Sequence, residues 1–192
     1  MICGLDEAGR GPLAGPVCAA AVVLPADFPL DLLDDSKKLN AVRREEAMRV
    51  IYLRALAWGI GWASAAEIDR LNIHHASLLA MRRAFLEMTA AGGSFASAAL
   101  TGIADGRFVP ELPIPCRALV KADAQIPEVM AASILAKTAR DRTMERYSWF
   151  YPEYGYEKHK GYPTKEHYRR LAIYGPSPIQ RMSFRWQSPA NG

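Results

Sequence analysis

The sequence predicts an α/β domain built around one mixed sheet. Short apolar runs bounded by glycine and proline alternate with longer segments of helical periodicity, a pattern typical of this class. At 192 residues, half of them hydrophobic, the chain fits one ordinary domain with a full core. After the last long helix we expect a small helical and irregular cap. Residues 1–146 should form the main domain, and residues 147–192 a basic and aromatic cap packed on it.

Each expected element has a local signal. Strands are expected over the apolar runs at residues 2–5, 17–24, 58–63, 98–104 and 117–120. Asn40 is placed to cap a helix through about residue 57, and Ser64-Ala65-Ala66-Glu67 has the form of a capping box that opens a short helix. Further helices are expected at residues 73–91, where Gly92-Gly93 follows, at 127–147 and at about 164–173.

Composition narrows the function classes. The net charge is only +4, but between Lys137 and Arg185 there are eleven Lys or Arg against five Asp or Glu, so phosphate contacts are expected there. The three cysteines form no CxxC pair, which disfavours zinc and disulfides and favours a reducing cytoplasm. The start lacks a basic segment typical of signal peptides, and the apolar run at residues 17–25 is too short to span a bilayer. We therefore expect a cytoplasmic protein without membrane association, by default a monomer.

Four acids stand at the ends of expected strands. Asp6-Glu7 ends an apolar run, Asp105 lies between such a run and Gly106, and Asp123 precedes the helix at residue 127. Each has an ordinary alternative: a solvated strand end, an Asp-Gly turn, or an acid in the first turn of a helix. Because strand ends of α/β sheets gather at one edge, the set predicts converging carboxylates, whose repulsion divalent cations commonly resolve. Oxygen ligands favour Mg²⁺ or Mn²⁺.

Two further segments could contact a ligand. The loop at residues 9–15, Gly-Arg-Gly-Pro-Leu-Ala-Gly, allows close approach of the backbone, but it lacks the Lys-Ser/Thr pair of a Walker loop, and on general grounds a tight turn is the more common explanation. Asp35-Ser36-Lys37-Lys38-Leu39 is a charged run that is either solvated or, beside an acidic site, suited to substrate phosphates.

Taken together, these segments resemble type 2 ribonuclease H, the ribonuclease HII family. The similarity runs in order from Met1 to about Phe184 and is carried by four segments: Asp6-Glu7-Ala8-Gly9-Arg10-Gly11-Pro12 with Gly15-Pro16, Asp35-Ser36-Lys37-Lys38-Leu39, Ala131-Ala132-Ser133-Ile134-Leu135-Ala136-Lys137 with Arg140-Asp141, and His159-Lys160-Gly161-Tyr162.

The resemblance implies a ribonuclease H-like fold and an endonuclease that cuts the RNA strand of RNA–DNA hybrids, single ribonucleotides in duplex DNA included. It implies two-metal catalysis with Mg²⁺ or Mn²⁺, leaving 5′-phosphate and 3′-hydroxyl ends. The metal-binding and catalytic carboxylates would be Asp6, Glu7, Asp105 and Asp123. The substrate would be bound by Gly9, Arg10 and Gly11 at the ribose 2′-hydroxyl, by Tyr162 stacking on the neighbouring deoxyribose, and by phosphate contacts of Lys37, Lys38, Lys160 and, less directly, Lys137.

The sequence departs from the family pattern where Ala122 replaces a common glycine and Gln180 a common histidine, but no carboxylate is lost. Asp141 lies among basic residues of a helix, so we expect a structural ion pair. His74-His75 lacks a partner at ligand spacing and is expected at the surface or partly packed. A non-catalytic nucleic-acid-binding module, a metal-independent glycosidase, and the related type with an extra N-terminal domain are the competing interpretations.

Overall fold

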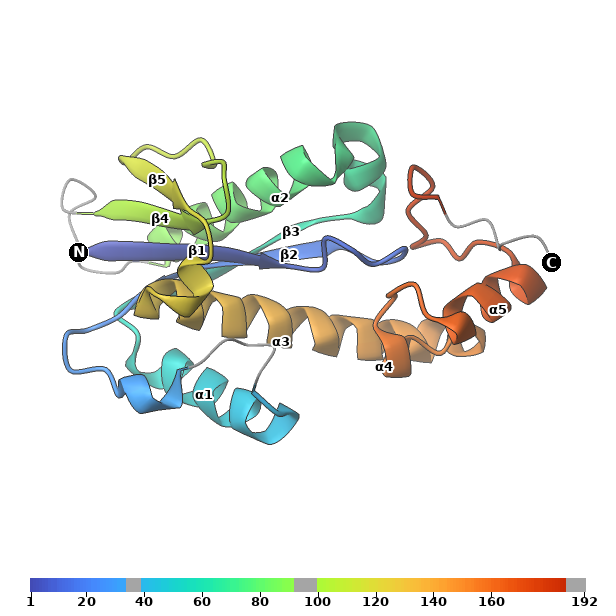
Figure 1. Cartoon of the computed structure of the whole chain (residues 1–192), viewed down its shortest axis with the longest axis horizontal. Helices are drawn as coiled ribbons and strands as arrows, with labels where there is room; N and C mark the ends of the chain where they lie inside the picture. Colours follow the sequence, from blue (N-terminus) through green and yellow to red (C-terminus); the bar gives the residue numbers. More distant parts are fainter. Residues whose placement is uncertain (34–38, 92–99, 186–192) are drawn as a thin grey trace.

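One five-stranded sheet forms the centre of the protein, with helices on both faces (Figure 1). The computed structural model describes residues 1–33, 39–91 and 100–185. The strands are arranged in the order β3-β2-β1-β4-β5. Their bounds are β1 Ile2–Ala8, β2 Val17–Val23, β3 Ala57–Ala63, β4 Thr101–Asp105 and β5 Cys116–Leu119.

The sheet is mixed, as expected. Strand β1 is antiparallel to β2 and parallel to β4, and β4 is parallel to β5. In the register of β1 and β4, Leu5 is paired with Ala104. The residues that follow, Asp6 and Asp105, therefore lie side by side at the carboxyl ends of two neighbouring strands.

The two faces of the sheet carry different helices (Figure 1). Helix α2 covers one face, while α3 covers the other together with α1, and α4 and α5 belong to the C-terminal cap. The helix bounds are α1 Ala41–Arg54, α2 Ala65–Ala90, α3 Pro127–Phe150, α4 Tyr156–His159 and α5 Lys165–Tyr174. Short 3₁₀ helices lie at Leu30–Leu32, Ala122–Ala124 and Pro152–Tyr154. Within the described ranges, no helix is long and apolar enough to cross a membrane.

Strand β2 explains why the sequence there is a continuous apolar run. All seven of its residues are buried: alternate side chains pack toward α2, and the others toward α1 and α3. Close packing on β3 requires glycine, because a Cβ at Gly61 would lie 2.1 Å from the Ala80 carbonyl oxygen of α2.

Most expected elements are present, with shifted ends. Asn40 caps α1 by accepting the Arg43 N–H, and the capping box at Ser64 and Glu67 is formed. The two helices expected on either side of residue 72 are one element, α2, kinked at Asn72 with φ 66°. Residues 98–99 of one expected strand lie outside the described residues. Helix α3 continues past residue 146, so the main domain and the cap share it.

The cap is organised around two stacked histidines. The rings of His159 and His167 lie 4.4 Å apart, and both side chains are buried. His159 Nδ1 accepts the Gly161 N–H (3.2 Å), so its Nε2 carries the proton shared with the Tyr154 carbonyl (2.9 Å). His167 Nδ1 lies 3.0 Å from the Tyr162 carbonyl, to which it must donate. Both rings are thus neutral, and each fixes the backbone at residues 161–162.

Burial, reinforced by the neighbouring His159, lowers the pKa of His167 to about 4 from an ordinary 6.5. In the unfolded chain this imidazole takes up a proton near pH 6.5, whereas in the folded chain it does so only near pH 4. The free energy of unfolding should therefore decrease by roughly 3 kcal/mol as the pH falls through that window. Urea unfolding of the wild type and His167→Gln at several pH values between 7 and 4 tests this. The variant should show a shallower dependence, while His75→Gln, at an exposed histidine, should keep the wild-type slope. If the free energy of unfolding depended equally on pH in all three proteins, the lowered pKa of His167 would be contradicted.

Candidate active site

A cavity of about 610 Å³ opens at the carboxyl ends of the parallel strands. It contains all four carboxylates expected from the sequence. Its lining residues are Asp6, Glu7, Ala8, Gly9, Arg10, Gly11, Arg44, Asp105, Asp123, Ser133, Lys137 and Tyr162.

Asp6 and Glu7 lie inside β1, which continues to Ala8, one residue further than Glu7. Consecutive strand residues ordinarily face opposite sides, yet both of these line the cavity because the strand ends immediately afterwards. Asp6 is 5% exposed. Its Oδ1 accepts the Glu7 N–H at 2.7 Å.

Asp105 and Asp123 come from the two neighbouring parallel strands. Asp105 is the last residue of β4, and Asp123 lies in the 3₁₀ helix that follows β5. The Ala122 N–H donates to Asp105 Oδ1 at 2.8 Å, which joins the two segments. Asp123 is 9% exposed. The acids are therefore placed by rigid elements and by hydrogen bonds of the main chain.

Burial raises the pKa of Asp6 well above its usual range, and the charges of Glu7 and Asp105 raise it further. A hydrogen bond from Ser133 and the one from the Glu7 N–H oppose this shift. Burial also raises the pKa of Glu7, against the opposing charge of Arg10. Bringing these acids together thus costs free energy that a cation could recover.

The donor set fits divalent cations that prefer oxygen. Glu7 Oε2 is buried without a hydrogen-bond partner, as expected for an atom that awaits a ligand. No three His, Cys, Asp or Glu side chains among the described residues already form a complete metal site. Besides the two hydrogen bonds to Asp6, Arg10 lies 3.1 Å from Glu7 Oε1, and Asp105 accepts the Ala122 N–H.

The loop between β1 and β2 is held by two buried arginines. Arg140, from α3, donates to the carbonyls of Pro16 (2.9 Å), Ala14 (3.2 Å) and Lys160 (3.1 Å). Arg181 donates to four carbonyls of the loop, those of Gly9 (2.6 Å), Arg10 (2.9 Å), Gly15 (2.8 Å) and Pro16 (3.2 Å). The loop therefore has one fixed conformation beside the carboxylates.

Gly9, Gly11 and Tyr162 lie together, as the family resemblance implies. Gly9 has φ +95°, and a Cβ there would lie 1.9 Å from Arg140 Nε, so only glycine fits. A Cβ at Gly11 would be 3.9 Å from the Tyr162 ring. Tyr162 is 38% exposed, with its ring available to the cavity.

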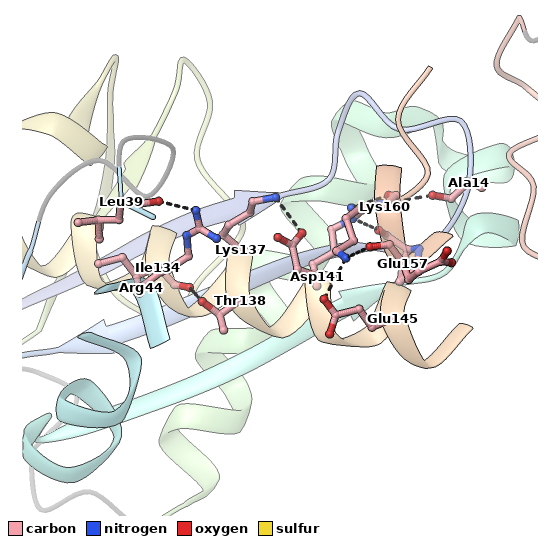
Figure 2. Close-up of polar contacts among 12 residues, drawn as sticks. Ala14, Leu39, Arg44, Ile134, Lys137, Thr138, Asp141, Glu145, Glu157 and Lys160 are labelled. Atoms are coloured by element: carbon pink, nitrogen blue, oxygen red, sulfur yellow. Dashed lines mark hydrogen bonds and ion pairs between the residues drawn. The ribbon is translucent and has the colours of Figure 1, made fainter. Parts of the chain in front are cut away.

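The lysines expected to bind phosphates differ in where they lie and what they contact (Figure 2). Lys37 and Lys38 lie outside the described residues. The Lys160 ammonium does not line the cavity; it pairs with Glu145 (2.9 Å) and bonds the Glu157 carbonyl. Asp141 forms the expected ion pair, 2.8 Å from Lys137 Nζ.

Two cavity residues were not expected from the sequence. Arg44, from α1, bonds the Leu39 carbonyl at 2.7 Å and reaches the cavity beside Lys137 (Figure 2). Ser133 bonds Asp6. The sequence could have indicated Ser133, because it is the one hydroxyl in an otherwise apolar, buried stretch of α3. Arg44 could not have been found in this way, because in the sequence it resembles any exposed helix residue.

Comparison with known proteins agrees with this geometry. The ribonuclease HII family profile matches residues 3–187. Ribonuclease HII of Treponema denticola is 54% identical over 96% of this chain and 98% of its own length. Ribonuclease HII of Dechloromonas aromatica is 48% identical over 96% of this chain and 90% of its own length.

Solved structures share the fold. Ribonuclease HII of Archaeoglobus fulgidus, solved in complex with PCNA, superposes with a TM-score of 0.72 at 25% identity, covering 100% of this chain and 98% of that one. Bst-RNase HIII, solved with Mn²⁺, superposes with a TM-score of 0.71 at 19% identity, covering 96% of this chain and 67% of that one. At this identity the similarity concerns the fold alone. With the family profile matching nearly the whole chain and relatives near 50% identity, the chain belongs to the ribonuclease HII family of metal-dependent endoribonucleases, which act on the RNA strand of RNA–DNA hybrids.

Proposed function

We propose that this chain cleaves the RNA strand of hybrids and single ribonucleotides embedded in duplex DNA, using two divalent cations, Mg²⁺ or Mn²⁺. The observation that carries the proposal is one cavity that joins four carboxylates to Gly9, Gly11 and Tyr162. Acids alone would suit many hydrolases. The adjoining loop and tyrosine supply a place where a ribose and its neighbour can be distinguished.

Asp6, Glu7, Asp105 and Asp123 would hold the cations. These would supply a water of lowered pKa as nucleophile and neutralise charge on the departing 3′-oxygen, so that the ends are 5′-phosphate and 3′-hydroxyl. The unpartnered Glu7 Oε2 and the raised pKa of Asp6 support this assignment. Ser133 orients Asp6 and favours its ionised form.

The remaining lining residues would bind substrate. Arg44 and Lys137 bring positive charge from α1 and α3 to the same cavity, where a phosphodiester would bind. The main chain of Gly9–Gly11 would contact the 2′-hydroxyl, and Tyr162 would stack on the adjacent deoxyribose. Lys160 would have to leave Glu145 and Glu157 before it could bind a phosphate.

A labelled DNA duplex with one ribonucleotide, incubated with Mg²⁺, Mn²⁺ or EDTA, tests the proposal. We expect a cut on the 5′ side of the ribonucleotide with either metal and none in EDTA. Cleavage of a continuous hybrid alone would refute the junction-recognition roles of Gly9–Gly11 and Tyr162 while keeping the nuclease. Inertness toward both substrates in both metals would favour a non-catalytic binding module.

Paired substitutions separate the ligand acids from the structural one. Asp6→Asn should lower kcat more than about 100-fold, because even groups that only support metal ligands contribute about 10- to 100-fold. Binding of the hybrid should persist. Asp141→Asn removes only a partly exposed ion pair, so kcat should stay within roughly fivefold of wild type. Titration with Mn²⁺, followed by calorimetry, should show weakened binding for Asp6→Asn alone. Equal losses of activity in the two variants would overturn the choice of ligands.

A further inference from the structure

A second, shallow hollow continues the active-site cavity past the carboxylates. It is lined by Glu7, Arg10 and Asp105, which also line the main cavity, and beyond them by Gly106, Arg107, Phe108, His74, Ser77, Leu78 and Met81. Tyr162 borders the main cavity, near Lys137 and Arg140 of α3, whereas Phe108 borders this hollow and packs on His74 of α2. Because α2 and α3 cover opposite faces of the sheet (Figure 1), the two aromatic side chains approach the carboxylates from opposite sides.

Phe108 is an exposed aromatic residue in a fixed position. Its side chain is 58% exposed, although the ring packs edge-on against His74 with centroids 4.4 Å apart. The hollow itself is only about 20 Å³, which is room for roughly one water. A sugar or a base is too large to enter it. A ligand can only lie across its rim, against the exposed part of the Phe108 ring.

The local fold positions both rings. The kink of α2 places Asn72 at φ 66°, where its Oδ1 accepts the N–H groups of His74 (2.9 Å) and His75 (3.2 Å) and caps the second half of the helix. Opposite, Gly106 follows Asp105 with φ +108°, which turns the chain outward so that Arg107 and Phe108 reach the rim. His74, which showed no ligand spacing in the sequence, thus supports Phe108.

Two arginines lie at this rim beside the acids Glu7 and Asp105, and they could contact phosphates of a strand that crosses it. Arg107 is exposed beside Phe108, and Arg10, half exposed, is shared with the main cavity. The bases of a duplex are paired and stacked, so an exposed aromatic ring at this rim would pack on a sugar of one strand, while the arginines contact its phosphates.

We propose that Phe108, supported by His74, is a packing platform for a sugar of the cleaved strand, on the side of the scissile phosphate opposite to Tyr162, with Arg107 contacting its phosphate. The proposal rests on the proposed function and adds a second anchor to it. The strand would be held on both sides of the carboxylates, by Tyr162 on one side and by Phe108 on the other.

Kinetics on substrates of different length test the platform. The full substrate is the duplex with one ribonucleotide; two shortened forms have the cleaved strand ending one nucleotide beyond the scissile phosphate, on the 5′ side or on the 3′ side. On the full substrate, Phe108→Ala should raise KM about two- to tenfold, the loss of one aromatic contact, with kcat unchanged. Phe108→Tyr, which keeps an aromatic face, should restore the wild-type KM. Phe150→Ala is the matched control, because Phe150 is 73% exposed but borders neither hollow.

One of the two shortened substrates no longer reaches Phe108. On that substrate alone, wild type and Phe108→Ala should have the same KM. A Phe108→Ala defect that persists on both shortened substrates, or that Phe108→Tyr shares, would overturn the platform, as would equal KM values for wild type, Phe108→Ala and Phe150→Ala on the full substrate. Failure of wild type to cut the full substrate would overturn the proposed function itself, whereas normal cutting with no Phe108 effect would overturn this inference alone.

Discussion

The geometry of the site depends on two buried guanidinium groups that bind main-chain carbonyls. All three nitrogens of Arg140 and of Arg181 donate to carbonyl oxygens, and six of the seven bonds go to the loop between β1 and β2. Burial is costly for a cation: it lowers the pKa of Arg140 and brings that of Arg181 to about 9, where the charge of Arg140 also contributes. Charge-assisted hydrogen bonds offset that cost and leave the loop a single conformation.

This interaction makes the sheet, α3 and the cap one unit. Arg140 also bonds the Lys160 carbonyl, and the Leu13 N–H donates to the Gly161 carbonyl at 2.8 Å. The histidine stack fixes the same segment from the other side through the main chain of Gly161 and Tyr162. Tyr162 is therefore positioned by contacts from the β1–β2 loop, from α3 and from the cap. A change in cap packing should therefore move Tyr162 without touching a carboxylate.

The sequence predicted what depends on short-range signals. Apolar runs located the strands, Asn40 and Ser64 located helix starts, and acids at strand ends located the cavity. It could not predict contacts made across long separations. Arg140 lies among alternating charges that resemble a solvated helix face, and its loop partners are 124 and 126 residues away. The pairing of His74 with Phe108 likewise depends on a left-handed residue, Asn72, inside what the periodicity indicated as two separate helices.

The saturation of the two buried arginines also explains why neither of them pairs with the acids. A guanidinium free to turn toward Asp6 or Glu7 would neutralise them, but Arg140 and Arg181 are committed to carbonyls on each of their nitrogens. The cation that does reach Glu7 is Arg10, at 3.1 Å, and its side chain is half exposed. Because the Glu7 carboxylate is buried, this contact partly offsets the effect of burial on its pKa. Arg140 and Arg181 thus hold the loop through its carbonyls, whereas Arg10 contacts a carboxylate, so the loop and the acids depend on different arginines.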